Sequence, residues 1–543
     1  MVTKPTGRKP ANPGKPKPAS ATPDAPNAIE ADPQYSTFAN TYGAGHAQVV
    51  WTRLIADLET PVSAYIKLAR DGAMSFLFES VESGAVRGRY SMIGLNPDLV
   101  WRAHGTGAEI NAAPGLSPDA FTPQKLPALA SLRDLIAQSK IDLPAHLPPM
   151  AAGVFGYMGY DTIRLVEFLP NANPDDLGVP DGILVRPTIM VIFDAVKDEM
   201  TIVTPVRPAS AITAQKAYAD ALARLTSVVS ALDTQLPHAA KASLPNLEAH
   251  EPVSNTTPAE YLGMVARAKE YIAAGDIFQV VLSQRFSAPF SLPPFALYRA
   301  LRRTNPSPFL FHLDFGTFAL VGSSPEILVR VREGIVTIRP IAGTARRGKD
   351  EAEDKALAKA LLADPKERSE HLMLLDLGRN DVGRVATPGT ICVTDQFVIE
   401  RYSHVMHIVS NVEGRLDPAH DPVDALMAGF PAGTVSGAPK VRAMEVIDEL
   451  ERSKRGPYAG CVGYFSADGE MDTAIVLRTA LVKDGQMHIQ AGAGVVYDSV
   501  PENEQQECIN KAKALVRAAE EAVRFATGSA SRKSATGNGG KFD

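Results

Sequence analysis

The chain has 543 residues, of which 45% are hydrophobic and 21% charged, and 55 basic against 61 acidic side chains give a formal net charge of −6. This composition is that of an ordinary globular protein of about three or four domain-sized units, and its acidic excess disfavours a broad nucleic-acid surface. No apolar run approaches the roughly 18 residues of a membrane span, and the three scattered cysteines form neither a disulfide framework nor a metal-binding pair. We therefore expect a cytoplasmic protein with no nucleic-acid or membrane partner.

The two ends of the chain predict disorder. Residues 1–33 contain eight prolines, six alanines and five basic residues, but almost no large aliphatic side chains. Such a segment cannot bury enough apolar area to offset the entropy lost on ordering. We therefore predict a disordered Pro/Ala/Lys-rich extension over residues 1–45 and a disordered tail over residues 528–543.

Between the ends, the chain divides at residues 234–257, which show neither a helical nor a strand period and predict a linker. We accordingly assign an N-terminal region to residues 46–250 and a C-terminal region to residues 251–527. The strands expected in the two regions are 63–68, 75–79, 151–157, 188–194, 277–286 and 318–321, and one helix is expected at 211–232. Because the strands do not follow a regular βαβ rhythm, we predict an α+β fold with a large mixed or antiparallel sheet.

Two helices of the C-terminal region carry paired carboxylates. Asp364 at an N-cap position, followed by a Pro and then by a Glu, signals the start of a helix that continues to Gly378. Glu367 and Glu370 lie one turn apart on that helix, on a face that becomes apolar further along.

A second helix opens near Ser499 and places Glu504 and Glu507 one turn apart. If the two helix faces meet in one cleft, their oxygen ligands suit Mg²⁺, which keeps waters and takes further ligands from its substrate. Each helix also has a plain structural explanation. Glu507 and Lys511 form an i,i+4 surface pair, and acids in a first turn favour the helix dipole.

Several other features have both a structural and a functional interpretation. His407 lies on a predicted strand, where most histidines are structural, and the polar face of residues 277–286 fits either a lined cavity or a solvent-facing strand. The loops at 433–440 and 492–497 fail the phosphate-loop and dinucleotide spacings, but their small residues let a backbone approach an anion closely. Arg478 offers a bidentate clamp for a carboxylate.

A set of motifs resembles the large subunits of the anthranilate synthase family, within the chorismate-utilising enzymes. The matching segments are Arg339-Pro-Ile-Ala-Gly-Thr344, Glu367-Arg-Ser-Glu-His371, Asp376-Leu-Gly-Arg-Asn-Asp381, Gly429-Phe-Pro-Ala-Gly-Thr-Val-Ser-Gly-Ala-Pro-Lys440, Gly460-Cys-Val-Gly-Tyr-Phe465, and Gln490-Ala-Gly-Ala-Gly494 with Asp498-Ser499 and Glu504/Glu507. They cover residues 255–520, and the N-terminal region matches more loosely. The resemblance implies large, mainly antiparallel sheets packed as a sandwich, with helices outside and the active site in a cleft.

The resemblance also implies roles for individual residues. It implies that Glu370 and Glu507 hold Mg²⁺, with Glu504 beside them. The implied catalytic residues are His407, Glu367 and Thr434. The residues implied to bind chorismate are Thr344, Gln279, Tyr458, Arg478, Gly492 and Gly494.

The implied reaction has two steps. Ammonia adds at ring C2 of chorismate while the C4 hydroxyl leaves, and pyruvate is then eliminated to give anthranilate, in the biosynthesis of tryptophan. Because hydroxide is a poor leaving group, we assign Glu367 as its general acid, and we assign His407 as the group that assists elimination. The Mg²⁺ would orient and polarise the ring carboxylate.

Two positions bear on which nucleophile is added. Isochorismate and salicylate synthases resemble this chain but have a Lys that activates water where Gln279 stands, which disfavours water addition here. Many aminodeoxychorismate synthases have a Lys where this chain has Ala342, but some have Ala, so aminodeoxychorismate synthase remains the alternative enzyme. A tryptophan-sensing subunit without catalysis is the non-enzymatic alternative, and the presence of all four helix carboxylates disfavours it.

Ammonia has no evident source within the chain. The nearest pattern to a glutaminase nucleophile, around Cys461, lies inside one of the family's own motifs. We therefore expect a separate glutaminase subunit, anthranilate synthase component II, in a hetero-oligomer of two large and two small subunits.

The resemblance further implies feedback inhibition by tryptophan. Leu77-Phe78-Glu79-Ser80 is similar to the Leu-Leu-Glu-Ser element at which tryptophan binds, with Phe78 as a departure that changes the pocket. The residues implied to form this pocket are Glu79, Ser80, Ser91, Pro308, Phe309, Leu310, Val462 and Tyr464.

Overall fold

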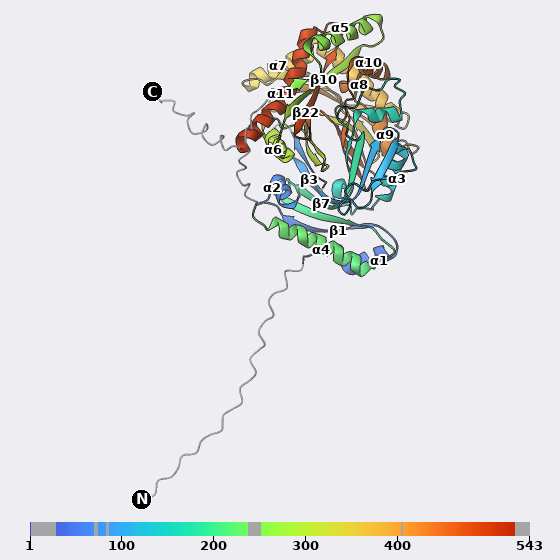
Figure 1. Cartoon of the computed structure of the whole chain (residues 1–543), viewed down its shortest axis with the longest axis vertical. Coiled ribbons are helices and arrows are strands. Elements are labelled where there is room, and N and C mark those ends of the chain that lie inside the picture. The colour runs from blue at the N-terminus through green and yellow to red at the C-terminus, as the bar shows by residue number, and fades with distance from the viewer. Residues whose placement is uncertain (2–28, 70–73, 83–85, 237–250, 403–404, 527–543) are drawn as a thin grey trace.

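The computed structural model describes residues 1, 29–69, 74–82, 86–236, 251–402 and 405–526 (Figure 1). The helices are α1 (Tyr35–Gly43), α2 (Pro61–Leu68), α3 (Ala128–Gln138), α4 (Ala214–Leu232), α5 (Pro258–Ala274), α6 (Pro294–Thr304), α7 (Glu351–Ala363), α8 (Pro365–Gly383), α9 (Pro422–Gly429), α10 (Lys440–Leu450) and α11 (Pro501–Ala526), with the 3-10 turns η1 (Pro149–Ala151), η2 (Tyr160–Leu165) and η3 (Gly433–Val435). Among the described residues, no helix is both long enough and apolar enough to cross a membrane.

The strands form one connected sheet. They are β1 (Gln48–Ile55), β2 (Ser75–Glu82), β3 (Val86–His104), β4 (Gly107–Asn111), β5 (Thr122–Pro123), β6 (Gly153–Met158), β7 (Gly182–Asp194), β8 (Glu199–Val206), β9 (Val253–Ser254), β10 (Gln279–Pro289), β11 (Phe309–Asp314), β12 (Phe318–Ser324), β13 (Ile327–Arg332), β14 (Ile335–Ile338), β15 (Ile341–Arg346), β16 (Cys392–Arg401), β17 (Val405–Arg415), β18 (Gly437–Ala438), β19 (Cys461–Ser466), β20 (Met471–Ile475), β21 (Thr479–Lys483) and β22 (Gln486–Val495). Every pairing between these described strands is antiparallel. The predicted α+β class with large antiparallel sheets is confirmed.

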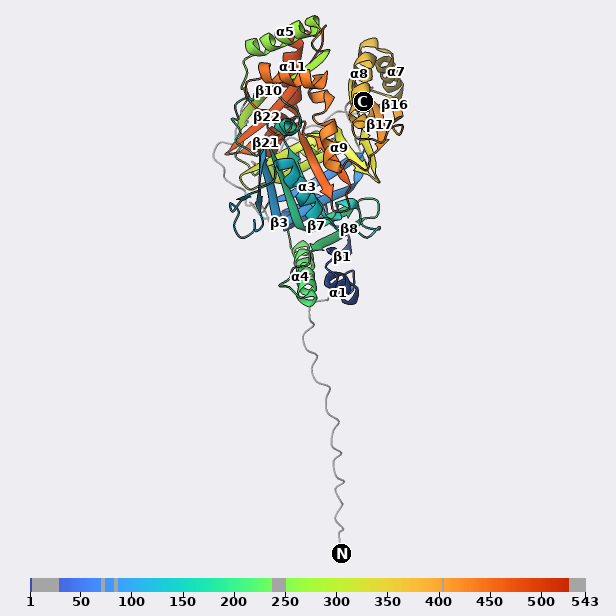
Figure 2. The same cartoon turned by 90° about the vertical axis from the view of Figure 1, so that its right-hand side faces the viewer.

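Strands of the N-terminal region lie in the middle of this sheet and join two arms of the C-terminal region. The β10 arm runs β10, β22, β21, β12 and β11, and β11 pairs with β2. The β17 arm runs β17, β14, β13, β20 and β19, and β19 pairs with β6. Through β3 and β7 the sheet continues from β2 to β6, and Figure 2 shows the two arms on opposite sides above these strands. The two predicted regions therefore share one sheet.

The sheet has two different cores, which is the layering of a sandwich. One core lies between sheet faces and is formed mostly by strand residues, such as Phe76, Phe155 and Leu320. The other packs helices, including α4, α5 and α11, on the opposite sheet faces. Because successive strand residues point to opposite faces, Leu77 joins the helix-covered core while its neighbour Phe76 joins the core between the sheets.

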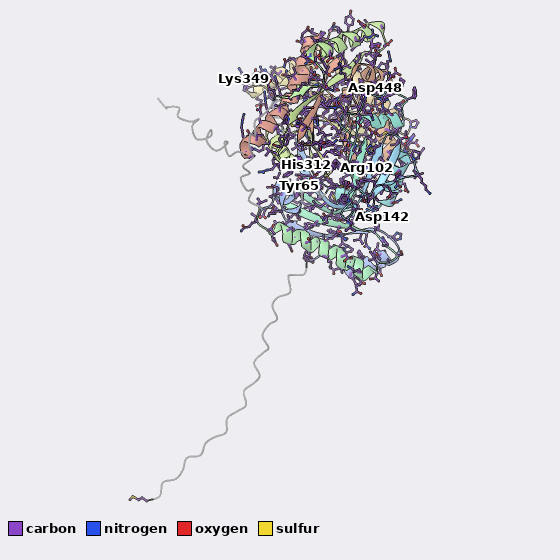
Figure 3. All side chains as sticks on the ribbon, in the orientation of Figure 1. Tyr65, Arg102, Asp142, His312, Lys349 and Asp448 are labelled. Carbon is purple, nitrogen blue, oxygen red and sulfur yellow. The ribbon has the colours of Figure 1, made fainter. Side chains whose placement is uncertain are left out.

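An aromatic cluster packs at the seam between the two regions. The His312 ring of β11 lies edge-on to Tyr65 of α2 and Phe295 of α6, with ring centroids 5.4 Å and 5.2 Å away (Figure 3). The His312 side chain is fully buried, and burial lowers its pKa to about 3. The imidazole is therefore neutral, and it packs as an aromatic ring between elements of both regions.

Most of the predicted elements are present. The strands predicted at 75–79, 151–157, 188–194, 277–286 and 318–321 correspond to β2, β6, β7, β10 and β12, and the helix predicted at 211–232 is α4. The strand predicted at 63–68 is wrong, because this segment is α2. Thr60 and Ser63 form a reciprocal capping box around Pro61, and this helix start outweighs the β-propensity of the following residues.

The predicted disordered extension over 1–45 is wrong at its C-terminal end. Residues 35–43 form α1, whose Phe38 is fully buried and lies 5.0 Å, between ring centroids, from Tyr218 of α4. The composition that predicted disorder was that of residues 1–33, and the prediction was extended over residues 34–45, which have three aromatic side chains and no proline. Residues 2–28, 237–250 and 527–543 lie outside the described residues, and so do most of the predicted linker and all of the predicted tail over 528–543.

The end of the predicted linker is ordered. Val253 and Ser254 form β9, which pairs with β10, and Thr257 caps α5 through a capping box with Glu260. The sequence 234–257 therefore includes the first folded residues of the C-terminal region, because a two-residue strand is too short to show a period.

Gly156 allows β6 to lie tightly between β19 and β7. A Cβ at this position would lie 1.9 Å from the Ile183 carbonyl oxygen, which is backbone and cannot rotate away. We expect Gly156→Ala to lower the free energy of unfolding by about 1–3 kcal/mol. Gly263→Ala is the matched control, since this exposed glycine of α5 meets nothing within 4 Å and the change should stabilise by about 1 kcal/mol. Urea unfolding that gave both variants the same stability would contradict this role of Gly156.

Candidate functional site

The predicted site residues gather where the free ends of the two arms face each other. Thr344 and His407 are paired across β15 and β17 in the β17 arm, whereas Gln279, Gly492 and Gly494 lie on β10 and β22 of the β10 arm. The acidic helices follow the same division, with α8 beside β17 and α11 beside β10 (Figure 2). The site is therefore assembled from two faces that belong to different parts of the sheet.

The carboxylates of α8 and α11 approach one another across this gap. The Asp364 side chain caps α8 by accepting hydrogen bonds from the amides of residues 366 and 367, as predicted. Burial and the nearby Glu507 raise the pKa of Glu370, and a hydrogen bond from Gln279 opposes this shift. Burial and Glu370 raise the pKa of Glu367, and burial and Glu507 raise that of Glu504. The two helix faces thus meet, which was the condition set by the sequence.

Helix α8 extends to Gly383, beyond the predicted end at Gly378. A Cβ on Gly378 would lie 3.3 Å from the side chain of Pro340 and 3.5 Å from that of Ile338. This glycine therefore gives the helix close contact with the β17 arm, and it does not end the helix.

The structural interpretation of Glu507 is also confirmed. Its Oε1 lies 2.8 Å from Lys511 Nζ, and both side chains are about half exposed. Lys511 Nζ also donates to the Gly492 carbonyl oxygen at 2.8 Å, which ties α11 to β22. The ion pair with Lys511 holds Glu507 at the edge of the gap, opposite Glu370.

The donor chemistry of the acidic faces fits a hard divalent cation. Within the described ranges, no three His, Cys, Asp or Glu side chains converge into a complete metal cage. Mg²⁺ does not need one, because one or two carboxylates, waters and substrate oxygens complete its shell. Glu370 and Glu507 offer oxygen ligands from facing helices, and a cation between them would relieve the repulsion that raises the pKa of Glu370.

His407 has a defined orientation in a buried position. Its Nδ1 lies 3.0 Å from the Gly343 carbonyl oxygen and 3.1 Å from Thr344 Oγ1. A carbonyl oxygen can only accept, so Nδ1 carries the proton and Nε2 is the basic nitrogen of the neutral ring. Burial lowers the pKa of His407, and Arg478 lowers it further. The neutral imidazole is thus the form present at neutral pH.

Glu326, which was not predicted from the sequence, lies beside Thr434. Thr434 Oγ1 is 3.1 Å from both carboxyl oxygens of Glu326, and the carboxyl lies in an almost fully buried position between β12 and β13. Burial raises the pKa of Glu326 to about 8, so that it is protonated at neutral pH. A signal was present in the sequence, because Glu326 is the only acid in an otherwise apolar run from Pro325 to Val329.

Two glycines and a guanidinium complete the β10 side of the site. A Cβ on Gly492 would lie 2.9 Å from the Tyr458 hydroxyl, and one on Gly494 would lie 2.7 Å from Gln279 Nε2. Burial lowers the pKa of Arg478, and no carboxylate in the described part of the chain pairs with its guanidinium. A partly buried, unpaired guanidinium is available to an anionic ligand.

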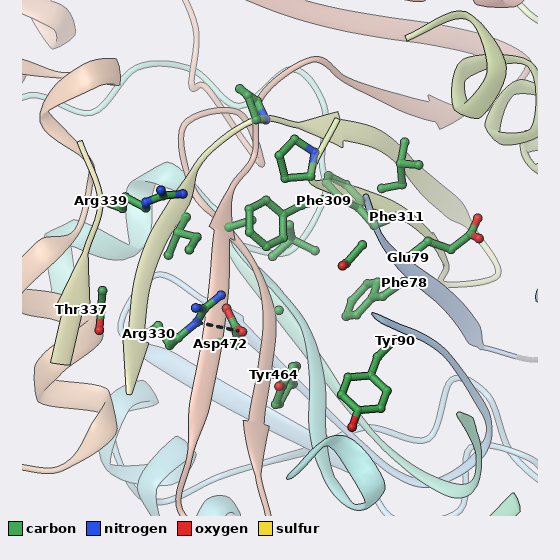
Figure 4. Close-up of a pocket in the computed structure, with 18 of the residues that line it drawn as sticks. Phe78, Glu79, Tyr90, Phe309, Phe311, Arg330, Thr337, Arg339, Tyr464 and Asp472 are labelled. Atoms are coloured by element: carbon green, nitrogen blue, oxygen red, sulfur yellow. Dashed lines mark hydrogen bonds and ion pairs between the residues drawn. The ribbon is translucent and has the colours of Figure 1, made fainter. Parts of the chain in front are cut away.

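A cavity of about 730 Å³ lies between the sheet faces (Figure 4). Its lining includes all but one of the residues expected at the inhibitor site, namely Glu79, Ser80, Pro308, Phe309, Leu310, Val462 and Tyr464. The remaining one, Ser91, is paired with Glu79 across β2 and β3. The Glu79 carboxylate points away from the Phe78 ring and is held by Arg302 at 2.6 Å and by the Tyr298 hydroxyl. The charge of Glu79 is therefore already balanced by Arg302 within the protein.

Comparison with known proteins identifies similar sequences. A family model described as chorismate binding enzyme matches residues 92–517. The chain is 56% identical over 492 residues to anthranilate synthase component 1 of Cereibacter sphaeroides, covering 91% of this chain and 98% of that protein. It is 47% identical over 468 residues to the component 1 of Thermus thermophilus, covering 86% and 96%.

Solved structures agree with these sequence matches. Anthranilate synthase component I from Streptococcus pneumoniae superposes with a TM-score of 0.70 at 38% identity, covering 85% of this chain and 99% of that chain. The menaquinone-specific isochorismate synthase from Escherichia coli shares the fold, with a TM-score of 0.65 at 21% identity and coverage of 90% and 100%.

The raised pKa of Glu326 makes stability depend on pH. The unfolded chain releases this proton near its ordinary pKa of 4.5, whereas the folded protein keeps it up to about pH 8. Stability associated with Glu326 is therefore fully present below about pH 4.5 and is lost as pH rises towards 8. Glu326→Gln should remove this loss, so its stability relative to the unsubstituted protein should grow by up to about 1.4 kcal/mol per pH unit in that window.

Urea unfolding at about pH 5, 6, 7 and 8 measures this difference. Glu502→Gln, at an exposed position in the first turn of α11, is the control and should show no such trend. Parallel pH profiles for Glu326→Gln and the unsubstituted protein would show that the buried carboxyl is ionised.

Proposed function

The chain belongs to the chorismate binding enzyme family, and from that premise we propose that it is the large subunit of an anthranilate synthase. It would convert chorismate and ammonia to anthranilate, pyruvate and water in tryptophan biosynthesis. The support is the identity of up to 56% with proteins named anthranilate synthase component 1, over nearly their whole length.

The observation that carries this proposal is the separation of two anion-binding features across the site. Chorismate has a ring carboxylate and an enolpyruvyl carboxylate at different ends of the molecule. Glu370 and Glu507 would hold the Mg²⁺ that orients and polarises the ring carboxylate. The unpaired Arg478, with Tyr458 and the backbone at Gly492 and Gly494, would bind the enolpyruvyl carboxylate. The substrate is thereby held at both ends, with its ring between the two arms.

In the first step the C2–N bond forms and the C4–O bond breaks. The departing hydroxyl needs a proton to leave as water, and outside the proposed Mg²⁺ site two carboxyls with raised pKa can supply it, Glu367 and Glu326. Glu326 is the more strongly shifted of the two, and its bond from Thr434 fixes its orientation. The amide of Gln279 cannot act as a base towards water, which favours a nucleophile that needs no deprotonation. Ammonia is such a nucleophile.

In the second step the C3–O bond to the enolpyruvyl group breaks and the C2 proton is removed, so that the ring becomes aromatic and pyruvate is released. We assign His407 to this proton. Its Nδ1 is committed to the Gly343 carbonyl, which leaves Nε2 as the base, and its lowered pKa keeps that nitrogen free of a proton at neutral pH. Thr344, which is paired with His407 across β15 and β17, also orients the imidazole ring.

We further propose that ammonia comes from a separate glutaminase subunit. Burial raises the pKa of Cys461 to about 12 and that of Cys508 to about 11, so neither is suited to act as a nucleophile. The relatives are named component 1, which implies a second component. The proposed assembly has two large and two small subunits in the cytoplasm.

We also propose the cavity between the sheet faces as the site of inhibition by tryptophan. Its volume and aromatic lining support an indole site. This cavity also reaches the catalytic residues, because Tyr402 lines it and the Tyr402 ring lies 5.5 Å from the ring of His407. With the Glu79 carboxylate already bound by Arg302, the ligand would be held largely through shape and backbone contacts beside Phe78 and Phe309.

The purified chain, incubated with chorismate, ammonium ions and Mg²⁺, should give the fluorescence of anthranilate. Chelation of Mg²⁺ should abolish the signal, because the ring carboxylate would then face unshielded Glu370 and Glu507. Glutamine in place of ammonium ions should give no product until a glutaminase subunit is added.

Each other outcome would exclude a part of the proposal. Aminodeoxychorismate without anthranilate would identify the alternative enzyme, and the absence of any product would identify a binding subunit. Activity that survives chelation would exclude the Mg²⁺ role, and equal activity of the chain alone with glutamine would exclude the separate glutaminase.

Single substitutions should separate the two steps. Glu326→Gln should block the first step, so that neither the amino intermediate nor anthranilate forms, with a loss of about 100-fold or more. Glu367→Gln should do the same if Glu367 shares this role. His407→Ala should allow the amino intermediate to accumulate, and rapid-quench chromatography measures both species. Formation of anthranilate from the isolated intermediate at an unchanged rate in His407→Ala would remove His407 from the second step.

A further inference from the structure

Arg455 is a cation with almost no exposure to solvent, in the loop between α10 and β19. Its side chain is 1% exposed and that of its partner Glu451 is 4% exposed. Nε donates to Glu451 Oε2 at 2.9 Å, and Nη2 donates to Glu451 Oε1 at 2.5 Å. The guanidinium is thus held as a two-pronged pair at the C-terminal end of α10.

The other donors of Arg455 reach the backbone of two segments, the turn η3 and the strand β10. Nη1 donates to the Val435 carbonyl oxygen and Nη2 to the Val281 carbonyl oxygen, each at 2.7 Å. Val435 directly follows Thr434, which bonds to Glu326, and Val281 lies two residues beyond Gln279 on β10. One planar group therefore bonds to both the turn that carries Thr434 and the strand that carries Gln279, which the pairing of β18 with β10 also joins.

The faces of the guanidinium are also used. Its central carbon lies 5.5 Å from the centroid of the Tyr458 ring and 4.7 Å from that of the Tyr160 ring, which belongs to η2 of the N-terminal region. The Tyr458 hydroxyl lies where a side chain on Gly492 would intrude. Arg455 therefore also supports the ring that faces the β22 backbone.

Stability alone does not account for a buried pair of this kind. Removing two charges from water costs several kcal/mol per ion, and apolar residues of similar volume often serve equally well. Glu451 in addition accepts from the amide and the hydroxyl of Ser283 on β10, both at 2.8 Å. What the pair achieves, and apolar packing would not, is a set of directional bonds that link α10, β10 and the Thr434 turn.

We propose that Arg455 is a positioning residue for the chorismate site, which it serves by fixing Thr434 and Tyr458 relative to β10. This inference rests on the proposed function, because it takes Thr434 and Tyr458 as walls of that site. Lysine cannot replace arginine here, since a single ammonium group cannot reach Glu451 and both carbonyl oxygens in one plane.

The test compares two Arg to Lys substitutions. Arg455→Lys should raise KM for chorismate and lower kcat/KM by about 100-fold, because small displacements of positioning groups have effects of this size. Arg164→Lys is the matched control. Arg164 binds Asp448 of α10 at 2.6 Å, Asp161 at 2.8 Å and the Leu169 carbonyl at 3.1 Å, but it touches no wall of the site. It should keep KM within about twofold of the unsubstituted value.

The kinetic pattern separates positioning from simple instability. A loss of folded protein lowers the apparent kcat and leaves KM unchanged, whereas a displaced wall raises KM in the folded fraction. An unchanged KM in Arg455→Lys, or the same rise in KM in Arg164→Lys, would overturn the proposal. If Arg455→Lys does not fold, Ser283→Ala loosens the same pair from β10 and should raise KM by a smaller factor. An unchanged KM in that variant would then overturn it.

Calorimetric binding of chorismate distinguishes this inference from the proposed function. If the unsubstituted chain binds chorismate without forming anthranilate, the proposed function fails, and Arg455→Lys should still weaken binding while Arg164→Lys does not. If the unsubstituted chain forms anthranilate and both variants bind chorismate with its affinity, the proposed function stands and the positioning role fails.

Discussion

The pairing of β2 with β11 and of β6 with β19 is the constraint on which the rest of the structure depends. These two ladders tie the arms of the C-terminal region to central strands of the N-terminal region. They are the β-ladders that connect the β10 and β17 arms through the central strands, and they bring α8 and α11 to face each other. Side-chain contacts such as the pair of Lys440 of α10 with Asp381 of α8 join the two arms as well. The site and the cavity of about 730 Å³ therefore both depend on one sheet, which contains strands from both regions of the chain.

Within that frame, burial sets the chemical state of the site residues. It keeps Glu326 protonated, keeps His407 neutral and lowers the pKa of Arg478. The chain carries a net charge of −6, although the proposed substrate is a dianion. Attraction to the substrate must therefore come from a few local groups, since the overall charge opposes it. The buried Arg455–Glu451 pair acts in a similar way. It fixes the backbone of the Thr434 turn and of β10, and its charges are not exposed to the ligand.

Short sequence patterns such as helix caps predicted individual elements well, because capping depends on only a few neighbouring residues. The Asp364 cap of α8 and the start of α11 were predicted because capping is decided within one turn. Residues 63–68 were assigned to a strand because β-propensity was given more weight than the cap at Thr60. The length of α8 was underestimated, because Gly378 was interpreted as a stop when it serves a helix-to-sheet contact. Helix α1 was missed because the disorder indicated by the composition of residues 1–33 was extended to residue 45, past the buried Phe38.

By itself, the sequence determined the class of fold, the paired carboxylates on two helices and the motifs that place the chain in its family. These properties depend on residue types and short spacings, which can be read along the chain. Only the tertiary structure decided that Glu370 and Glu507 face each other, that Glu326 is buried beside Thr434, and that Arg455 bonds to both the Thr434 turn and β10. The reason is physical, since burial and the approach of distant strands depend on how the two arms pack, and no local spacing specifies that.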